Sequence, residues 1–154
     1  KRAKPHSHHR STLSAKSNPN GLQTMILDAL LTESLLSHLP KIVQPIELVA
    51  SLDNSPTSAK ITELLGELDV LSADISVRFD GSAQRRPSFR ITRVTDPHVS
   101  VTFGGVPLGH EFTSLVLALL KVGGHPSTAD ADLLDQTRGI PGTHHFETFF
   151  SLSC

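Results

Sequence analysis

A single sulfur and a few titratable side chains are the groups in this sequence that could carry chemistry. Cys154 is the only cysteine. A thiolate at a helix N-terminus can attack disulfides, whereas a lone cysteine is usually an inert, small apolar side chain. Glu111, in Gly109-His110-Glu111-Phe112, stands at the start of an apolar helical pattern, where a negative charge suits the helix dipole. The role of both residues therefore depends on where the fold places them.

The histidines do not predict a metal site. His6, His8 and His9 could bind a metal ion adventitiously, but they lie in a segment without hydrophobic periodicity and form no closed set of ligands. The pair His110-Glu111 lacks the second histidine of a zinc-protease helix, and no glycine-rich phosphate loop follows a predicted strand. We expect neither a metal nor a bound cofactor in this chain.

Charge divides the sequence after residue 24. Residues 1–24 contain five basic residues and no acid, and are rich in His, Ser and Pro, which predicts a disordered and dispensable tail. The only methionine, Met25, precedes the first amphipathic segment, so we expect it to be the authentic start and residues 1–24 to be an upstream extension. The remaining residues carry 9 basic and 15 acidic groups, which disfavours nucleic-acid binding.

Hydropathy and sulfur content indicate a soluble, cytoplasmic protein. No stretch approaches the roughly 18 apolar residues of a membrane span, and residues 1–24 lack the apolar run of a secretory signal. One cysteine cannot form an internal disulfide framework and suits a reducing compartment.

Hydrophobic periodicity predicts seven elements between residues 27 and 122. Apolar residues at helical spacing predict helices over residues 27–39, 56–71 and 112–120. Apolar alternation predicts strands over 46–52, 75–79, 89–91 and 99–103. Ser55 and Pro56 are typical of an N-cap and a first helical residue. Asp96-Pro97 is predicted to be the turn between the last two strands, and Gly123-Gly124 to end the last helix.

This order predicts an α/β, thioredoxin-like fold for residues 25–122. A strand–helix–strand crossover implies parallel pairing and a short turn implies a hairpin, which together give a mixed four-stranded sheet with helices on both faces. In such folds a redox dithiol sits where the first strand meets its helix; here that junction is Asp53-Asn54-Ser55-Pro56, which has no sulfur. Pro87 precedes the third strand, where these folds often place a cis-proline, and we expect it to shape the start of that strand.

Residues 123–154 predict the start of a second, truncated copy of the same fold. Ser127 and Asp130 resemble a capping box before a short helix that ends at Gly139, and residues 144–153 read as a strand. Helix then strand repeats the opening of the first unit. Cys154 therefore falls at the position where the dithiol of the second copy would begin.

Several stretches resemble the flavoprotein subunit of bacterial alkyl hydroperoxide reductase. They are residues 46–53, 86–89, 107–120, 123–127 and 146–154, of which Pro107-Leu108-Gly109-His110-Glu111-Phe112-Thr113 begins the most specific. The resemblance covers about residue 25 to 154. It implies an N-terminal domain with two thioredoxin-like folds, the first without cysteine and the second with a Cys-x-x-Cys pair.

The resemblance also implies roles for two residues. Cys154 would be the first cysteine of the pair and would attack the disulfide of a partner peroxiredoxin, in a parent that uses FAD and NADH and is a homodimer. Glu111 would match a glutamate that faces the dithiol from the cysteine-less half, as a proton acceptor.

The sequence departs from that pattern because the resolving cysteine and the flavin and nicotinamide domains are absent from it. Exchange through one thiol stops at a mixed disulfide, so we expect this chain alone to be inactive. The alternative function is a redox-inert, thioredoxin-like docking or adaptor domain.

Overall fold

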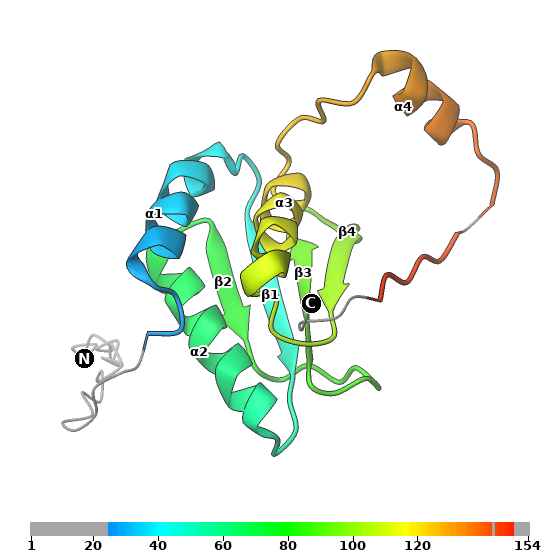
Figure 1. Ribbon diagram of the computed structural model, residues 1–154. Coiled ribbons are helices and arrows are strands. Elements are labelled where there is room, and N and C mark those ends of the chain that lie inside the picture. Colours follow the sequence, from blue (N-terminus) through cyan, green and yellow to red (C-terminus); the bar gives the residue numbers. More distant parts are fainter. Residues whose placement is uncertain (1–24, 143, 150–154) are drawn as a thin grey trace, which may run out of the picture.

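The computed structural model describes residues 25–142 and 144–149. Residues 1–24 and Cys154, on which two of the predictions rest, lie outside them. Figure 1 shows one compact body followed by a short outlying helix. In chain order the elements are α1 Ala29–His38, η1 Leu39–Lys41, β1 Ile46–Ser51, α2 Pro56–Leu71, β2 Ile75–Arg78, β3 Ser88–Arg93, β4 Asp96–Phe103, η2 Gly109–Glu111, α3 Phe112–Val122 and α4 Ala131–Arg138.

The four strands form the predicted mixed sheet, in the order β2-β1-β3-β4. β1 pairs with β2 in parallel through the α2 crossover, and β3 runs antiparallel to both β1 and β4. Leu48 on β1 faces Ile91 on β3 at the centre of the sheet, and both side chains are fully buried. The strand–helix–strand and hairpin halves therefore meet along these two inner strands.

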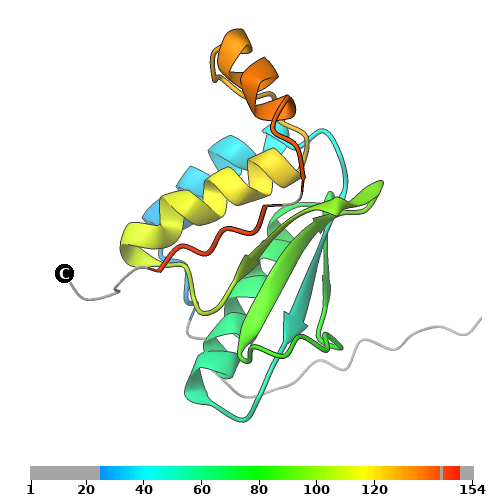
Figure 2. The ribbon, with the colours of Figure 1, turned by 90° about the vertical axis from the view of Figure 1, so that its right-hand side faces the viewer.

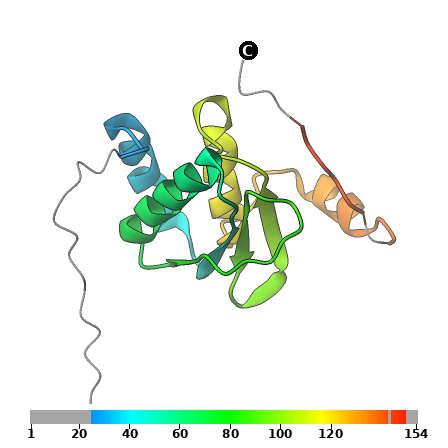
Figure 3. The same ribbon diagram turned by 90° about the horizontal axis from the view of Figure 1, so that it is seen from below.

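All three helices of the body cover the same face of the sheet, as Figures 2 and 3 show, so the prediction of helices on both faces is wrong. The link from β2 to β3, residues 79–87, contains no helix that could cross to the other side. The cause is the alternation of residue types along β1. Ile46, Leu48 and Ala50 are buried under the helices, whereas Glu47 and Val49 point the other way and remain partly exposed. A face of hydroxyls and charges cannot bury an apolar helix.

The helices α1, α2 and α4 begin where a capping side chain accepts a hydrogen bond from a backbone N–H group of the first turn. The Ser55 side chain accepts a hydrogen bond from the Ser58 N–H at the start of α2, with Pro56 in the first turn, as predicted. Ahead of α1, the Glu67 carboxylate accepts hydrogen bonds from the backbone N–H groups of Ile26 and Leu27, at 2.7 and 3.1 Å. This contact from α2 fixes the segment before α1 and holds Leu27 in the core.

The hairpin between β3 and β4 turns earlier than predicted. The turn is formed by Val94 and Thr95, and Asp96-Pro97 already belongs to β4, where Asp96 pairs with Arg93. The prediction placed the turn at Asp96-Pro97 because both residue types favour turns. β4 is an edge strand, and a proline that cannot donate a ladder hydrogen bond is tolerated there.

The C-terminal segment agrees with the prediction only in part. A helix, α4, ends at Gly139 as predicted, but its N-cap is Asp130, whose side chain accepts from the Asp132 N–H, whereas the Ser127 hydroxyl accepts from the Ala129 N–H. The predicted strand over 144–153 is wrong for residues 144–149, which belong to no strand. A strand needs a neighbouring edge, and no described strand pairs with this segment.

The loop of residues 79–87 is fastened to the end of β1. The Gly81 N–H donates to the Ala50 carbonyl and the Ala83 N–H donates to the Ser51 hydroxyl, both at 2.9 Å. A Cβ atom on Gly81 would lie 2.4 Å from Ser51 Oγ and 2.6 Å from the Ala50 carbonyl oxygen. This close approach explains why the loop has a glycine at this position.

Two glycine-to-alanine substitutions should therefore shift stability in opposite directions. Gly81→Ala should lower the free energy of unfolding by about 1–3 kcal/mol, because the loop must move off β1. Gly66→Ala in α2, where a Cβ meets nothing within 4 Å, should raise it by about 0.5–1 kcal/mol. Urea unfolding of both variants checks this, and equal effects would contradict the close contact at Gly81.

Candidate functional site

The junction between β1 and α2 is where a thioredoxin-type fold presents its reactive group, and here it is filled by a closed polar network. Asp53 Oδ1 accepts hydrogen bonds from the Ser55 N–H, at 2.9 Å, and from the Ser58 hydroxyl, at 2.7 Å. The Ser58 hydroxyl in turn accepts from the Asp53 N–H. The donors at this helix start are thus used within the junction itself.

The charge of Asp53 is stabilised by this network. Hydrogen bonds from Ser55, and then from Ser58, hold the pKa of the Asp53 carboxyl below its ordinary value. A carboxylate at a helix N-terminus also suits the helix dipole. The junction therefore carries a permanent negative charge at neutral pH and no nucleophile.

Pro87 lies next to this junction. The Arg86–Pro87 peptide bond is cis, and the following residue, Ser88, pairs with Ser51 at the end of β1. Ser88 is buried, and its hydroxyl donates to the Arg85 carbonyl at 2.7 Å. The proline thus stands at the start of β3, as the sequence indicated.

Glu111 closes the short η2 turn and is the residue from which α3 begins. Gly109 has φ +64° at the start of that turn, a conformation that glycine adopts without strain. The Glu111 carboxylate is half-exposed and accepts a hydrogen bond from the Ser114 hydroxyl, at 3.0 Å. Its carboxylate can therefore favour the helix dipole while keeping free lone pairs. Cys154 lies outside the described residues, so the pairing of Glu111 with Cys154 stays a prediction.

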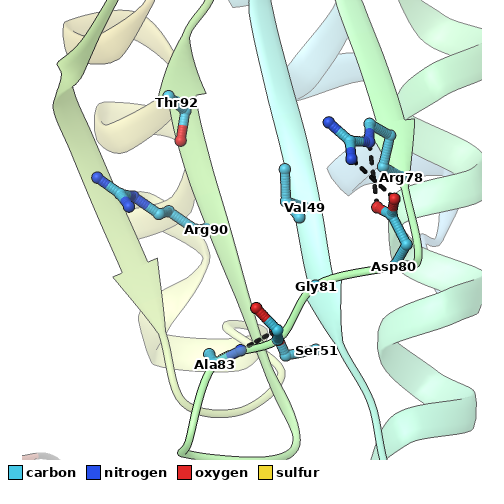
Figure 4. Close-up of a pocket in the computed structure, with 9 residues that line it drawn as sticks. Val49, Ser51, Arg78, Asp80, Gly81, Ala83, Arg90 and Thr92 are labelled. Atoms are coloured by element: carbon cyan, nitrogen blue, oxygen red, sulfur yellow. Dashed lines mark hydrogen bonds and ion pairs between the residues drawn. The ribbon is translucent and has the colours of Figure 1, made fainter.

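The sequence interpretation missed a groove on the open face of the sheet. Figure 4 shows it from that side, with Val49 and Ser51 on β1 between Arg78 on β2 and Arg90 on β3. Its volume is about 430 Å³. Alternating Ser, Thr and Arg residues along β1 and β3 were the signal, because residues two apart share a face of a strand.

Metal sites and membrane spans are both absent from residues 25–142 and 144–149. There, no group of three His, Cys, Asp or Glu side chains is arranged to hold a metal ion. In the same part of the chain, every helix is too short or too polar to span a bilayer.

The fold defines the class: this is a thioredoxin-like α/β domain. The chain superimposes on the N-terminal domain of alkylhydroperoxide reductase AhpF from Enterococcus faecalis with a TM-score of 0.66 and 23% sequence identity. The match covers 75% of this chain and 61% of that one. The predicted fold class is thereby confirmed.

Sequence comparison identifies closer relatives. The chain is 51% identical over 129 residues to the alkyl hydroperoxide reductase F subunit of Pseudomonas aeruginosa and 48% identical over 130 residues to that of Escherichia coli. It is 43% identical over 130 residues to a Bacillus subtilis protein named NADH dehydrogenase. Each match covers 84% of this chain and 25% of the relative. No family model matches.

These findings confirm the resemblance to the F subunit of alkyl hydroperoxide reductase, AhpF. Relatives of that name cover 84% of this chain at 40–51% identity. The chain spans about a quarter of the length of these relatives.

The junction network generates a prediction about pH. Because the pKa of Asp53 is lower in the folded state than its ordinary value of 3.8, its contribution is present at neutral pH and is lost as the pH falls through the folded value. Asp53→Asn should therefore lower the melting temperature at pH 7, and the difference from wild type should shrink below about pH 4. Asp69→Asn, exposed on α2, is the matched control and should follow the wild type at every pH. A constant deficit for Asp53→Asn would show that its charge contributes nothing.

Proposed function

We propose that this chain is the N-terminal portion of an NADH- and FAD-dependent disulfide reductase that passes electrons through a dithiol to a peroxiredoxin and so removes alkyl hydroperoxides and hydrogen peroxide. The single observation that carries the proposal is the 51% identity to an AhpF protein across 84% of the chain. Within it, residues 25–122 are the redox-silent half, and residues 123–154 begin the half that carries the dithiol.

The described junction supports assigning the dithiol to residues 123–154 and no redox step to residues 25–122. The β1–α2 junction offers a carboxylate and serine hydroxyls where a redox-active fold needs thiols, and its donors are engaged by Asp53. The sulfur of the chain lies at Cys154, after α4 and the extended segment that follows it. The redox step is therefore assigned to the second unit.

The proposed reaction is thiol–disulfide exchange. The Cys154 thiolate attacks one sulfur of the partner's disulfide, forms a mixed disulfide and releases the other partner sulfur as a thiolate. In the parent, the second thiol of the Cys-x-x-Cys pair then attacks the Cys154 sulfur, so that the partner leaves as a dithiol and the reductase holds the disulfide. Two electrons have passed to the partner, and the disulfide left on the reductase would need two further electrons, which the flavin of the parent would supply.

The described fold does not fit either cofactor. A dinucleotide pyrophosphate is held by a glycine-rich turn between a strand and a helix N-terminus. The corresponding turn, Asp53-Asn54-Ser55, has no glycine, and its carboxylate would repel a phosphate. We therefore assign FAD and NADH to the part of the relatives that this chain does not span, and no step in this chain uses them.

The partner in this proposal is the peroxiredoxin subunit of alkyl hydroperoxide reductase, the parent is a homodimer, and its compartment is the reducing cytoplasm. The second candidate is a redox-inert docking domain, which the sulfur-free junction of residues 53–56 favours. A reductase forms a covalent disulfide bond with its partner during the reaction, whereas a docking domain binds its partner only through noncovalent contacts.

Trapping the mixed disulfide separates these functions. The chain, incubated with the disulfide form of the peroxiredoxin subunit, should give a covalent one-to-one adduct on a non-reducing gel, because the resolving thiol is missing. Cys154→Ser should abolish the adduct. A matched control restores a thiol elsewhere, as Ser127→Cys in the Cys154→Ser background, at an exposed residue. A docking domain would instead bind without an adduct, or form one equally through either cysteine.

The second test concerns Glu111 in the full-length parent. If its carboxylate faces the dithiol, it raises the thiol pKa by like-charge repulsion and accepts the proton during exchange. Glu111→Gln should then shift the pH dependence of thiol alkylation and leave flavin reduction by NADH unchanged. If it acts only on the helix dipole, the change should cost about 0.3–1 kcal/mol of stability and nothing in reactivity. Superimposable alkylation profiles would decide in favour of the helix dipole.

A further inference from the structure

Basic side chains in the described part of the chain are concentrated in one segment. Residues 78–93 contain Arg78, Arg85, Arg86, Arg90 and Arg93, with Asp80 as the only acid, whereas the other described residues hold 4 basic and 14 acidic groups. This segment is β2, the loop of residues 79–87 and β3. An acidic protein thus carries a compact basic region on and beside the open face of its sheet.

Some of these arginines are already neutralised. Arg78 binds Asp80 at 2.7 Å and Glu47 at 3.5 Å, and Arg85 lies 3.4 Å from Glu147. Arg93 points to the helix side, where its guanidinium donates to the carbonyls of Val122 and Lys121 at the end of α3. These three side chains are therefore committed to the fold.

Arg86 and Arg90 differ, because their donors meet only uncharged acceptors. Arg90 donates to the Pro97 carbonyl and to the Ser100 hydroxyl, and Arg86 donates to the Ala83 carbonyl. Both are exposed, and among the described residues no carboxylate lies within 4.0 Å of either. Arg90 therefore lines the groove with an uncompensated charge, and Arg86 contacts the carbonyl of Ala83, which also lines it, at 3.1 Å.

The groove adds hydroxyl groups and a small apolar floor to these charges. Ser51, Thr92 and Val49 line it (Figure 4), and so do Ser82 and the ion pair of Arg78 with Asp80. All the helices of the body lie on the other side of the sheet, and on this face the loop of residues 79–87 closes one end of the groove over the buried Ser51. The planar guanidinium of arginine matches a carboxylate through two parallel hydrogen bonds.

We propose that this groove, lined by Arg90 and adjoined by Arg86 through Ala83, docks an acidic peptide segment of a partner protein. Arg86 and Arg90 come from two separate segments, so a ligand that contacts both needs several carboxylates along one chain. A small anion can contact only one of the two guanidiniums. A nucleic acid is disfavoured because 14 acidic and 4 basic groups on the rest of the described chain would repel its long phosphate backbone. This docking is independent of Cys154 and of the proposed reductase function.

The test is a titration of the isotopically labelled 154-residue chain with capped hexa-glutamate, followed by backbone NMR shifts at low salt. Shifts should cluster on Val49, Ser51, residues 81–83, Arg90 and Thr92. Capped hexa-glutamine, the uncharged match, should cause none, and inorganic phosphate should bind far more weakly. Added salt should weaken the peptide complex, because exposed charge pairs are screened.

Variants locate the contact. Arg90→Gln and Arg86→Gln should each raise the dissociation constant about twofold to fivefold, whereas Arg138→Gln, an exposed arginine on α4, should leave it unchanged. Arg90→Lys keeps the charge but loses the planar guanidinium, so its dissociation constant should lie between those of the wild type and Arg90→Gln. Unchanged backbone shifts away from the groove show that each variant is folded. Equal binding by the Arg138 and Arg90 variants, shifts centred on the helices, or phosphate binding as strong as the peptide would overturn the proposal. Concentration-dependent shifts at the groove without peptide would overturn it in favour of a second copy of the chain.

Discussion

The structure depends on the alternation of residue types along β1 and β3. On one side, Leu48, Ala50, Phe89 and Ile91 are buried, and every helix of the body packs there. On the other side, the same strands present Glu47, Val49, Arg90 and Thr92, which are partly or fully exposed, so that the sheet has one buried face and one solvent-facing face. Because side chains alternate strictly along a strand, a slip of one residue in register would exchange these faces. The core, the position of the β1–α2 junction and the groove all follow from this single arrangement.

Local hydrogen bonding explains how the domain keeps its fold without a thiol at the β1–α2 junction. Thioredoxin-type chemistry depends on the junction after β1, yet the junction here is held by hydrogen bonds among Asp53, Ser55 and Ser58. These bonds satisfy the start of α2 without a sulfur atom, so the scaffold is retained when the thiols are absent.

Much of the fold could be predicted from the sequence, and the exceptions have physical causes. Strong periodicity placed the helices, and the Ser55-Pro56 pair gave the start of α2 correctly. Local turn preference misplaced the hairpin, because an edge strand accepts Pro97 and the turn needs only Val94 and Thr95. Residues 144–149 have the sequence pattern of a strand, but no described strand edge lies beside them. Strand pairing depends on residues far apart in the sequence, so it cannot be predicted from the local pattern alone. The groove was missed for a related reason: its residues come from three strands and a loop, and only the register brings them together.

The charge segregation between residues 78–93 and the rest of the chain has a consequence for motion in an electric field. The isoelectric point is about 6.8, so near neutral pH the net electrophoretic force on the chain almost vanishes. The separated charges remain, however, and they give the body a permanent dipole moment. A negatively charged surface would attract residues 78–93 and repel the excess of acidic groups on the other described residues, which tends to turn the open face of the sheet toward it before contact. At physiological ionic strength this orientation acts only within about 8 Å of the surface, which makes it a property of the last step of an encounter.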